Sequence, residues 1–438
     1  MKSRKRLKRL KLLAISQLRR LRHLDMRKAL PLALLVMVLA GVLCSCVPSC
    51  GDRDNITLFN SQKFHQNVPI IRVKLGSHSE TFLATNAGYR LSVDGRDVYG
   101  ANNALSPTQI RRSGRNWLIN DQAISGDVLE LRPFENTLFV YCQTYYRGSL
   151  VLRALGDDQF IAINHVDMES YLAGVLPKEL RSMWLEETYK ALAVTARTFA
   201  RYQAVTVGPS NVYDVTDDQA SQVYGGYSAE TPKSRSAVMA TRGQMLVYNG
   251  QGQQGIFLAQ YSASCGGIVN AAQVLRNAAP LQPLLGGQTC NDCSACPRYR
   301  WSPVKVNKSD VYRALAAAYP AAAGMGSVTD VRVAERTNYG RQLWLDIVGS
   351  SGAAPLRIRA DDLRLALLRA KVSGASSIYS MNCQIRSVGE SLEFYDGRGF
   401  GHGVGLCQWG AEGKAEKGWK AQQILAFYYP GAGLMKVY

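Results

Sequence analysis

The chain has 438 residues, 47% of them hydrophobic and 9% aromatic, which is enough for two or three globular domains with a sizeable core. The formal net charge is +19, but residues 1–30 alone contain twelve Lys and Arg against one Asp. The rest of the chain is mildly basic, which suits an anionic envelope polymer or a membrane surface as well as nucleic acid, with plain solubility as the alternative. Because much of the excess charge is confined to the N-terminal segment, we expect no nucleic-acid partner.

The basic N-terminal segment is followed by an apolar stretch, Leu30–Leu43, that is fourteen residues long. This is shorter than the roughly 20 residues that a membrane-spanning helix needs, so the pattern indicates an export signal. The end of the stretch, Leu-Cys-Ser-Cys, resembles a bacterial lipoprotein signal, with Cys46 as the acylated residue. The protein is thus expected to be exported and anchored to the bacterial membrane, facing the cell wall, by a lipid or by its signal. A start at Met1 and a start at Met26 are both compatible with this pattern.

Residues 1–46 are this leader and signal, and residues 47–68 read as a polar tether with little periodicity. Residues 69–165 alternate between short apolar runs and Gly, Asn or Asp turns, which predicts a β-rich N-terminal module. The expected strands are 70–75, 81–86, 89–95, 127–133, 137–142, 149–155 and 159–164.

Residues 166–438 are expected to form a mixed core of helices and strands, so the predicted fold class is α+β. The strongest helical pattern spans residues 185–203, whose apolar side chains recur on one face. Residues 297–380 are expected to be an α/β subdomain within this core. The end of the sequence predicts a strand, a glycine-rich turn at residues 397–405 and two short helices.

The segment VLPKEL places Glu179 in the bend before the long predicted helix. Its neighbours include Leu176, Leu180 and Trp184, and burial against apolar side chains raises the pKa of a carboxyl by disfavouring its charged form. A carboxyl that stays protonated near neutral pH can donate a proton in catalysis. The alternative is an ordinary surface glutamate in a connection between helices.

The sequence has ten cysteines, and in an exported chain they indicate disulfides or a metal site. The segment CNDCSACP gives Cys290, Cys293 and Cys296 the spacing of metal ligands, and Cys265 is a candidate for the fourth thiolate. Disulfides are the first expectation, a structural zinc bound by these four residues the second, and an iron–sulfur cluster the third. The ferredoxin pattern needs a cysteine where Arg300 stands. No other cofactor is expected.

Five motifs follow one another along the chain: YLAGVLPKEL with ALAVTARTFARYQ, DVTDDQASQVYGGYSAETP, YSASCGG, GRGFGHGVGLCQWGAEGKAEKGW, and ILAFYYPGAGL. Together they resemble the stage II sporulation protein D / LytB (SpoIID/LytB) family over about residues 68–438. The chain departs from the family's metal-binding members at Ala220-Ser221, where those members have a His-Cys pair. We therefore expect that metal site to be absent.

The resemblance implies a peptidoglycan lytic transglycosylase, with Glu179 of the P-x-E element as its catalytic acid. Glu179 would protonate the glycosidic oxygen that leaves N-acetylmuramic acid and then accept the proton of that sugar's C6 hydroxyl. The product would be a 1,6-anhydro ring. Because no water attacks, the second carboxylate of ordinary glycosidases is not required.

The other motifs supply candidate substrate-binding residues. By the resemblance, TDDQASQVY lines the cleft with groups that can hydrogen-bond sugars or offer a ring face. These residues are Asp217, Asp218, Gln219, Gln222 and Tyr224. The alternative is a polar turn with a core tyrosine. Tyr261 and Ser262 are expected to line the cleft. A catalytic nucleophile in this segment is not expected, because a Ser or Cys nucleophile needs a base and nothing local links this segment to His402. His402 and Gln408 would contact substrate or orient Glu179, with a purely structural role in the glycine-rich turn as the alternative for His402.

Two further functions stay open. The LytB side of the family enhances a partner N-acetylmuramoyl-L-alanine amidase without cleaving glycan, and a lipoprotein that only binds peptidoglycan is the third alternative. The expected partners are therefore peptidoglycan glycan strands, the membrane and, in the second case, an amidase.

Overall fold

The computed structural model describes residues 68–250, 253–276 and 280–438. The leader and signal of residues 1–46, with Cys46, and the tether up to residue 67 lie outside the described residues. Within the described ranges, every helix is too short or too polar to span a bilayer.

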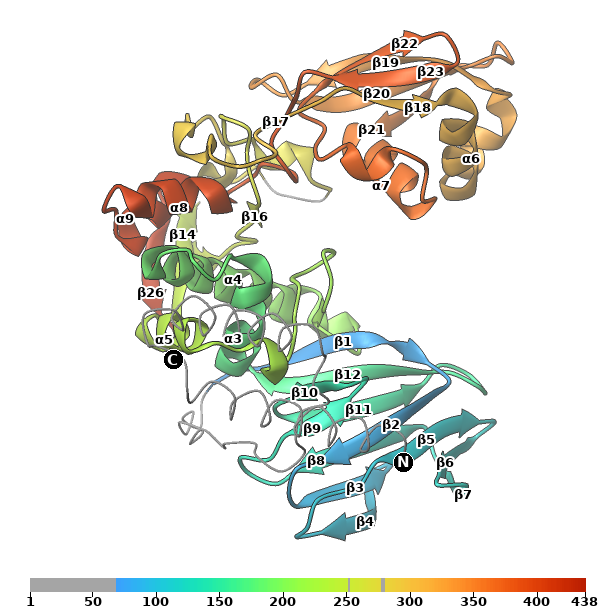
Figure 1. Ribbon diagram of the computed structural model, residues 1–438, viewed down its shortest axis with the longest axis vertical. Coiled ribbons are helices and arrows are strands. Elements are labelled where there is room, and N and C mark those ends of the chain that lie inside the picture. The colour runs from blue at the N-terminus through green and yellow to red at the C-terminus, as the bar shows by residue number, and fades with distance from the viewer. Residues whose placement is uncertain (1–67, 251–252, 277–279) are drawn as a thin grey trace, which may run out of the picture. The chain divides into compact units, whose positions relative to one another are not determined.

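The N-terminal part of the described chain consists of two sheets (Figure 1). One has the strand order β13-β1-β12-β11-β8-β3-β4 and the other the order β10-β9-β2-β5-β6-β7. Trp117 of β6 and Phe160 of β12 belong to different sheets, and their ring centroids are 5.5 Å apart, so the two sheets pack face to face. The strands are β1 Ile70–His78, β2 Glu80–Thr85, β3 Tyr89–Val93, β4 Arg96–Ala101, β5 Thr108–Ser113, β6 Asn116–Ile119, β7 Gln122–Ser125, β8 Val128–Pro133, β9 Phe139–Tyr141, β10 Thr144–Tyr146, β11 Ser149–Ala154, β12 Phe160–Asp167 and β13 Val215–Thr216.

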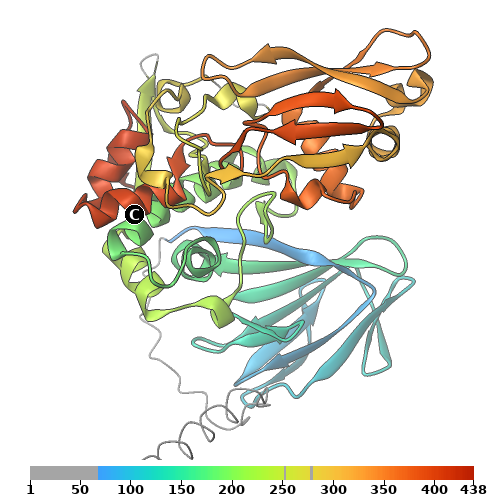
Figure 2. The same cartoon turned by 45° about the horizontal axis from the view of Figure 1, so that its top comes forward.

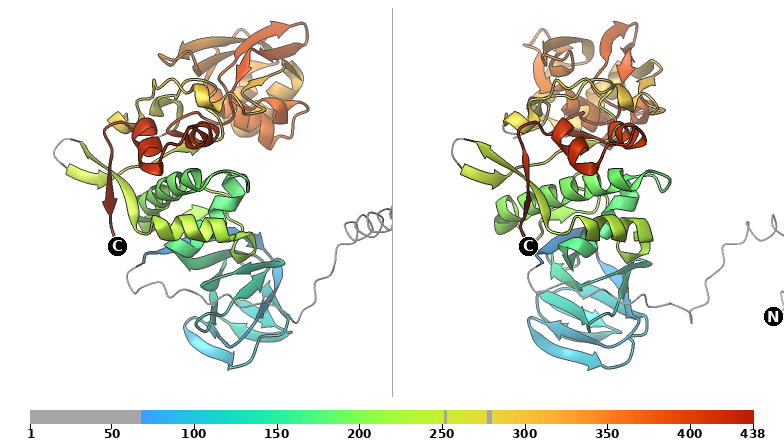
Figure 3. Two further views of the ribbon diagram at one scale, coloured as in Figure 1. Left: turned by 60° about the vertical axis from the view of Figure 1, so that its left-hand side comes forward. Right: turned by 90° about the vertical axis from the view of Figure 1, so that its left-hand side faces the viewer.

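A group of helices follows the sheets (Figure 3). It comprises α3 (Met168–Glu179), α4 (Glu186–Thr206) and α5 (Pro232–Ala240), and α4 also contacts β1 and the C-terminal helices α8 (Gln408–Glu416) and α9 (Ala421–Tyr428). The helix predicted for residues 185–203 is confirmed as α4. Helix α3 extends further than expected, so Glu179 is the last residue of a helix rather than part of a bend.

A fully buried ion pair joins α3 to α4. Arg197 donates to Glu169 through Nε at 2.9 Å and through Nη2 at 2.5 Å, and neither side chain has exposed surface. The same carboxylate accepts hydrogen bonds from the Tyr438 hydroxyl at 2.5 Å and from the Gly243 amide at 3.3 Å. Arg197 also donates to the Gln244 carbonyl at 3.2 Å. The pair therefore connects two helices, the start of β14 and the last residue of the sequence.

A second hydrophobic core runs from Val304 to Phe394. Its sheets have the orders β18-β23-β22 and β19-β20-β21. Figure 2 shows their yellow, orange and red strands gathered together. The subdomain expected at 297–380 thus includes two strands beyond residue 380, because β18 pairs with β23. The elements are β18 Val304–Asn307, α6 Lys308–Ala318, β19 Val328–Arg336, β20 Gln342–Gly349, β21 Leu356–Arg359, α7 Ala360–Arg369, β22 Gln384–Val388 and β23 Ser391–Tyr395.

Short strands connect the motifs on either side of this subdomain. The parallel pair of β16 and β25 aligns Tyr261 with Leu406 and Ser262 with Cys407. This pairing brings YSASCGG beside GLCQWG although the two motifs are far apart in sequence. The remaining strands are β14 Gln244–Gly250, β15 Gln253–Ile256, β16 Tyr261–Ser262, β17 Arg300–Trp301, β24 Gly397–Arg398, β25 Leu406–Cys407 and β26 Gly433–Lys436. The predicted α+β class is confirmed.

Candidate functional site

Glu179 lies at the C-terminal end of α3. The helix begins after Asp167, whose side chain accepts hydrogen bonds from the amides of Glu169 and Ser170 at 3.1 and 2.9 Å. It ends at Glu179, because Leu180 has extended backbone angles. The carbonyl end of a helix carries partial negative charge, which disfavours an ionised carboxyl there.

The Glu179 carboxyl is half-buried and bound by groups from other motifs. Its Oε1 accepts from the Val223 amide at 3.0 Å, and its Oε2 accepts from Gln408 Nε2 at 3.1 Å. Interaction with the Tyr261 side chain also lowers the pKa of this carboxyl. Three motifs that are separated in the sequence thus converge on one acidic group.

Burial raises the pKa of Glu179 above its usual value, because the charged form loses solvation. Hydrogen bonds from Val223 and Gln408, together with the Tyr261 side chain, act in the opposite direction but do not cancel this effect. The result is a partly solvated carboxyl that keeps its proton to a higher pH than an exposed glutamate would. Such a group can serve as a general acid and, after losing its proton, as a base.

Gln222 supports the site from inside the protein. Its side chain has no exposed surface; Oε1 accepts from the Tyr171 hydroxyl at 3.2 Å, and Nε2 donates to the Tyr261 hydroxyl at 3.1 Å. Tyr224 is also buried, and its hydroxyl donates to Asn164 Oδ1 at 3.0 Å. The expected substrate contacts of Gln222 and Tyr224 are therefore wrong, since both side chains are packed in the core.

The rest of that segment forms a polar turn. Asp218 is exposed, and its Oδ1 accepts from Thr216 Oγ1 at 2.8 Å and from the Ala220 amide at 2.9 Å. Gln219 is exposed as well. Asp217 is half-buried, and burial raises the pKa of its carboxyl. Of these three residues, Asp217 is the least exposed to solvent. The Asp218 side chain stabilises the turn through its hydrogen bonds.

The glycine-rich turn is held by hydrogen bonds of its own. His402 Nδ1 accepts from the Val404 amide at 3.1 Å, and Ser262 Oγ accepts from the Gly403 amide at 3.1 Å. Arg341 of the subdomain donates to the Gly401 carbonyl at 2.8 Å. Burial, together with the charge of Arg341, lowers the pKa of His402 to about 4, so the imidazole is neutral near pH 7. His402 and Ser262 thus have structural contacts in the turn, whereas Gln408 reaches the carboxyl.

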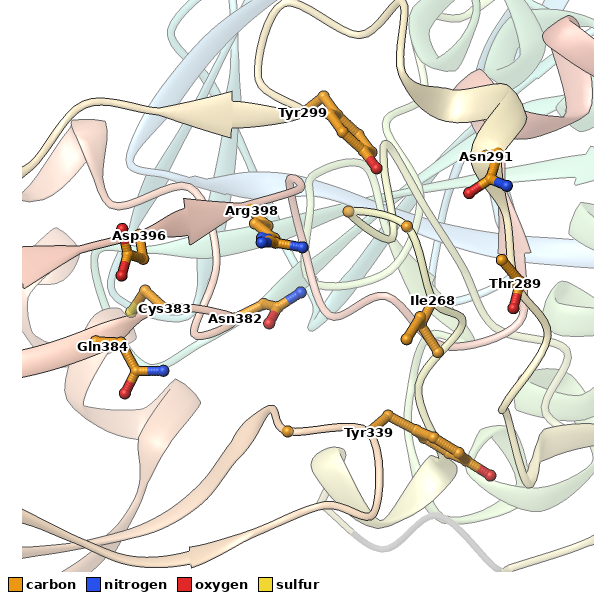
Figure 4. A pocket seen from close by; sticks show the side chains of 13 residues that line it. Ile268, Thr289, Asn291, Tyr299, Tyr339, Asn382, Cys383, Gln384, Asp396 and Arg398 are labelled. Carbon is orange, nitrogen blue, oxygen red and sulfur yellow. The ribbon is translucent and has the colours of Figure 1, made fainter.

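A separate cavity of about 560 Å³ lies beside the Gly266-Gly267 turn (Figure 4). In Figure 4 the side chains of Arg398 and Asn382 lie between those of Tyr299 and Tyr339. These groups combine hydrogen-bond donors, acceptors and ring faces. Glu179 is not among the thirteen described residues that line the cavity, so this space is distinct from the surroundings of the acid.

The cysteines gather at a third place. All seven cysteines in the described part of the chain are free, so the expected disulfides are not formed among them. Cys265, Cys290, Cys293 and Cys407 are buried, with their sulfur atoms within 4.8 Å of one another. The predicted ligand set contained Cys296, whereas the structure places the sulfur of Cys407 with those of the other three cysteines.

Comparison with known proteins identifies the family of this chain. The family model described as Stage II sporulation protein matches residues 156–248, and a model described as Domain of unknown function (DUF8618) matches residues 251–405. An uncharacterized protein of Brachyspira hyodysenteriae is 30% identical over 291 residues, 66% of this chain and 72% of that protein. Stage II sporulation protein D of Bacillus subtilis is 24% identical over 286 residues, 62% of this chain and 75% of that protein. The chain belongs to the SpoIID/LytB family.

A further SpoIID/LytB relative is the amidase enhancer of Bacillus subtilis, which is 28% identical over 302 residues. These residues are 60% of this chain, but the chain spans only 40% of the length of that relative. Both branches of the SpoIID/LytB family are therefore represented among the relatives. The matched segment of the first family model contains Glu179 together with Val223, its amide partner.

Sequence reasoning missed three groups: one at the Glu179 carboxyl, one in the cysteine cluster and one at the glycine-rich turn. The Val223 amide could not be found, because a backbone donor leaves no signal in residue type. Cys407 was visible as a cysteine but has no local spacing to the CNDCSACP segment. Arg341 comes from the subdomain, and only the tertiary structure places its guanidinium on the Gly401 carbonyl.

Proposed function

We propose that this SpoIID/LytB protein is a peptidoglycan lytic transglycosylase with Glu179 as its catalytic acid and base. The observation that supports the proposal is the half-buried Glu179 carboxyl, with a raised pKa and with donors at 3.0 and 3.1 Å from two other motifs. Two fixed donors orient the carboxyl, while its partial exposure leaves it within reach of a bound glycan strand. As part of the proposal, the protein is exported and anchored through Cys46.

The reaction needs one carboxyl. Protonated Glu179 gives its proton to the oxygen that bridges C1 of N-acetylmuramic acid and the next sugar, and the bond between C1 and that oxygen breaks. The C6 hydroxyl oxygen of the same muramic acid then bonds to C1. Ionised Glu179 takes the C6 hydroxyl proton, so the acid is regenerated and the new end is a 1,6-anhydro sugar. No water molecule is consumed.

The product identifies the reaction. Purified protein incubated with glycan strands, with and without stem peptides, is expected to release fragments that end in 1,6-anhydromuramic acid, detected by mass spectrometry. Fragments with ordinary reducing ends would indicate hydrolysis and would contradict the proposal. Intact strands in both preparations would also contradict it.

A second candidate is supported by the amidase enhancer among the relatives. In this case the protein binds glycan and stimulates an N-acetylmuramoyl-L-alanine amidase without cleaving strands. Adding the protein to such an amidase and measuring the release of stem peptides distinguishes the two functions. Faster peptide release in the absence of any 1,6-anhydro product would favour the enhancer.

The pH dependence of cleavage should reflect the pKa of Glu179. Since the reaction begins with the protonated acid, the rate is expected to fall as pH rises through that pKa, at a pH above the usual glutamate value of 4.5. Gln408→Leu removes a hydrogen bond that lowers the pKa, so this alkaline limb should move to still higher pH. Rate measurements on wild type and on Gln408→Leu test the shift. The exposed Gln422→Leu is the matched control, and a limb that stays in place in Gln408→Leu would refute the assignment.

A further inference from the structure

Four cysteine sulfurs lie together in the interior next to the start of α8. Cys265, Cys290, Cys293 and Cys407 each have at most 1% of their surface exposed. The sulfurs of Cys265 and Cys293 are 3.7 Å apart, and all four lie within 4.8 Å of one another. Four thiolates at about 2.3 Å from one zinc ion in a tetrahedron lie about 3.8 Å apart, which matches this spacing. A disulfide would need about 2.05 Å.

The surroundings of the sulfurs suit negatively charged thiolates. Cys407 Sγ accepts from the amides of Gly410 and Cys265, each at 3.3 Å. The Tyr428 hydroxyl lies 3.1 Å from Cys290 Sγ, where it can donate a hydrogen bond to a thiolate. Such donors in the outer shell orient metal-binding thiolates and compensate their charge.

The packing of α8 leaves space for the sulfurs. A Cβ atom on Gly410 would lie 2.4 Å from Cys290 Sγ and 3.3 Å from Cys407 Sγ. Any other residue at this position would therefore require the Cys290 sulfur and the nearby Tyr428 hydroxyl to shift. Asp292, between two of the cysteines, forms an ion pair at 2.8 Å with Lys414 of α8. The loop that contains Cys290 and Cys293 is thus fixed to the same helix.

We propose that Cys265, Cys290, Cys293 and Cys407 bind one Zn²⁺ ion as a closed structural site that fixes the start of α8 and thereby positions Gln408 on Glu179. Binding releases the four thiol protons and leaves the ion with four protein ligands, so no position is open for substrate or water. Cys407 directly precedes Gln408, whose Nε2 lies 3.1 Å from Glu179 Oε2. Gln408 is accordingly a positioning residue, and only this second part of the proposal depends on the proposed function.

Metal content tests the site independently of activity. The full chain, purified without chelators, is expected to contain about one zinc ion per molecule by inductively coupled plasma mass spectrometry. Cys290→Ser and Cys407→Ser should lose the zinc, whereas Cys296→Ser, from the same loop but outside the cluster, should keep it. Absence of zinc, or iron in its place, would overturn the proposal. An intact mass that is lower by four hydrogens would also overturn it, because this loss indicates two disulfides.

Hydrogen exchange tests the positioning role. Removing zinc with a chelator should increase amide exchange in residues 406–416 and, if cleavage occurs, move its alkaline limb to higher pH as in Gln408→Leu. Restoring zinc should reverse both effects. Unchanged exchange in residues 406–416 after metal removal would refute the positioning role. Failure of wild-type cleavage with zinc still bound would contradict the proposed function alone.

Discussion

Replacing Glu179 by glutamine is expected to reduce the rate of glycan cleavage by roughly 10²–10⁴-fold, the range that a positioned acid or base contributes. Glutamine has nearly the same shape, so the Val223 amide keeps an acceptor. Its amide is far too weak an acid to transfer a proton to the bridging oxygen, and its amide nitrogen faces the Gln408 donor that now binds Glu179 Oε2. Single-turnover release of 1,6-anhydro ends measures this loss.

The matched control is Glu186→Gln at the start of α4, where the glutamate side chain is 48% exposed. It should cleave at the wild-type rate. Circular dichroism and the thermal midpoint of each variant separate loss of chemistry from loss of fold. A folded Glu179→Gln protein that cleaves as fast as wild type would show that another group supplies the proton.

The second large effect concerns stability. Arg197→Ala is expected to lower the free energy of unfolding by about 3–5 kcal/mol, because it leaves the buried Glu169 carboxylate without its counter-charge. The loss also affects the Gln244 carbonyl, which accepts from Arg197 at 3.2 Å. Since Glu169 lies on the helix that ends at Glu179, the same change should weaken cleavage. Chemical denaturation followed by circular dichroism measures the stability difference.

An exposed ion pair provides the comparison. Arg132 donates to Glu130 at 2.6 Å, but the arginine side chain is 67% exposed. Arg132→Ala should therefore cost less than about 1 kcal/mol, since water replaces most of the lost interaction. Equal effects of Arg132→Ala and Arg197→Ala would mean that burial of the Arg197 pair has no energetic consequence.

Much of the fold could be predicted because its signals are local. The seven expected strands overlap β1, β2, β3, β8, β9, β11 and β12. Strands such as β2, β8 and β11 alternate between buried and more exposed side chains, whereas β12 is an apolar run that is buried at almost every position. Strands such as β4 and β7 were not predicted, since their residues are almost all exposed and show no alternation. The extension of the subdomain past residue 380 depends on the pairing of β18 with β23, which no local pattern indicates.

In the site, too, residues with a local sequence signal could be predicted, whereas contacts between distant segments could not. Glu179 could be identified from its own motif, and Gln408 from another, but their contact required the structure. The roles of Gln222 and Tyr224 depend on burial. The sequence alone does not show whether a polar or aromatic side chain lies in a cleft or in the core. The predicted ligand set includes Cys296 and not Cys407, because nearness in sequence was the only available guide.

The contact between Glu179 and Gln408 spans 229 positions of the chain. During translation, Glu179 is therefore made long before Gln408, the residue that orients it. The intervening subdomain has to be synthesised first. During that interval the newly made polypeptide lacks a finished site. The hydrogen-bonded environment of the Glu179 carboxyl is therefore complete only after residue 408 has been made and has folded against the end of α3.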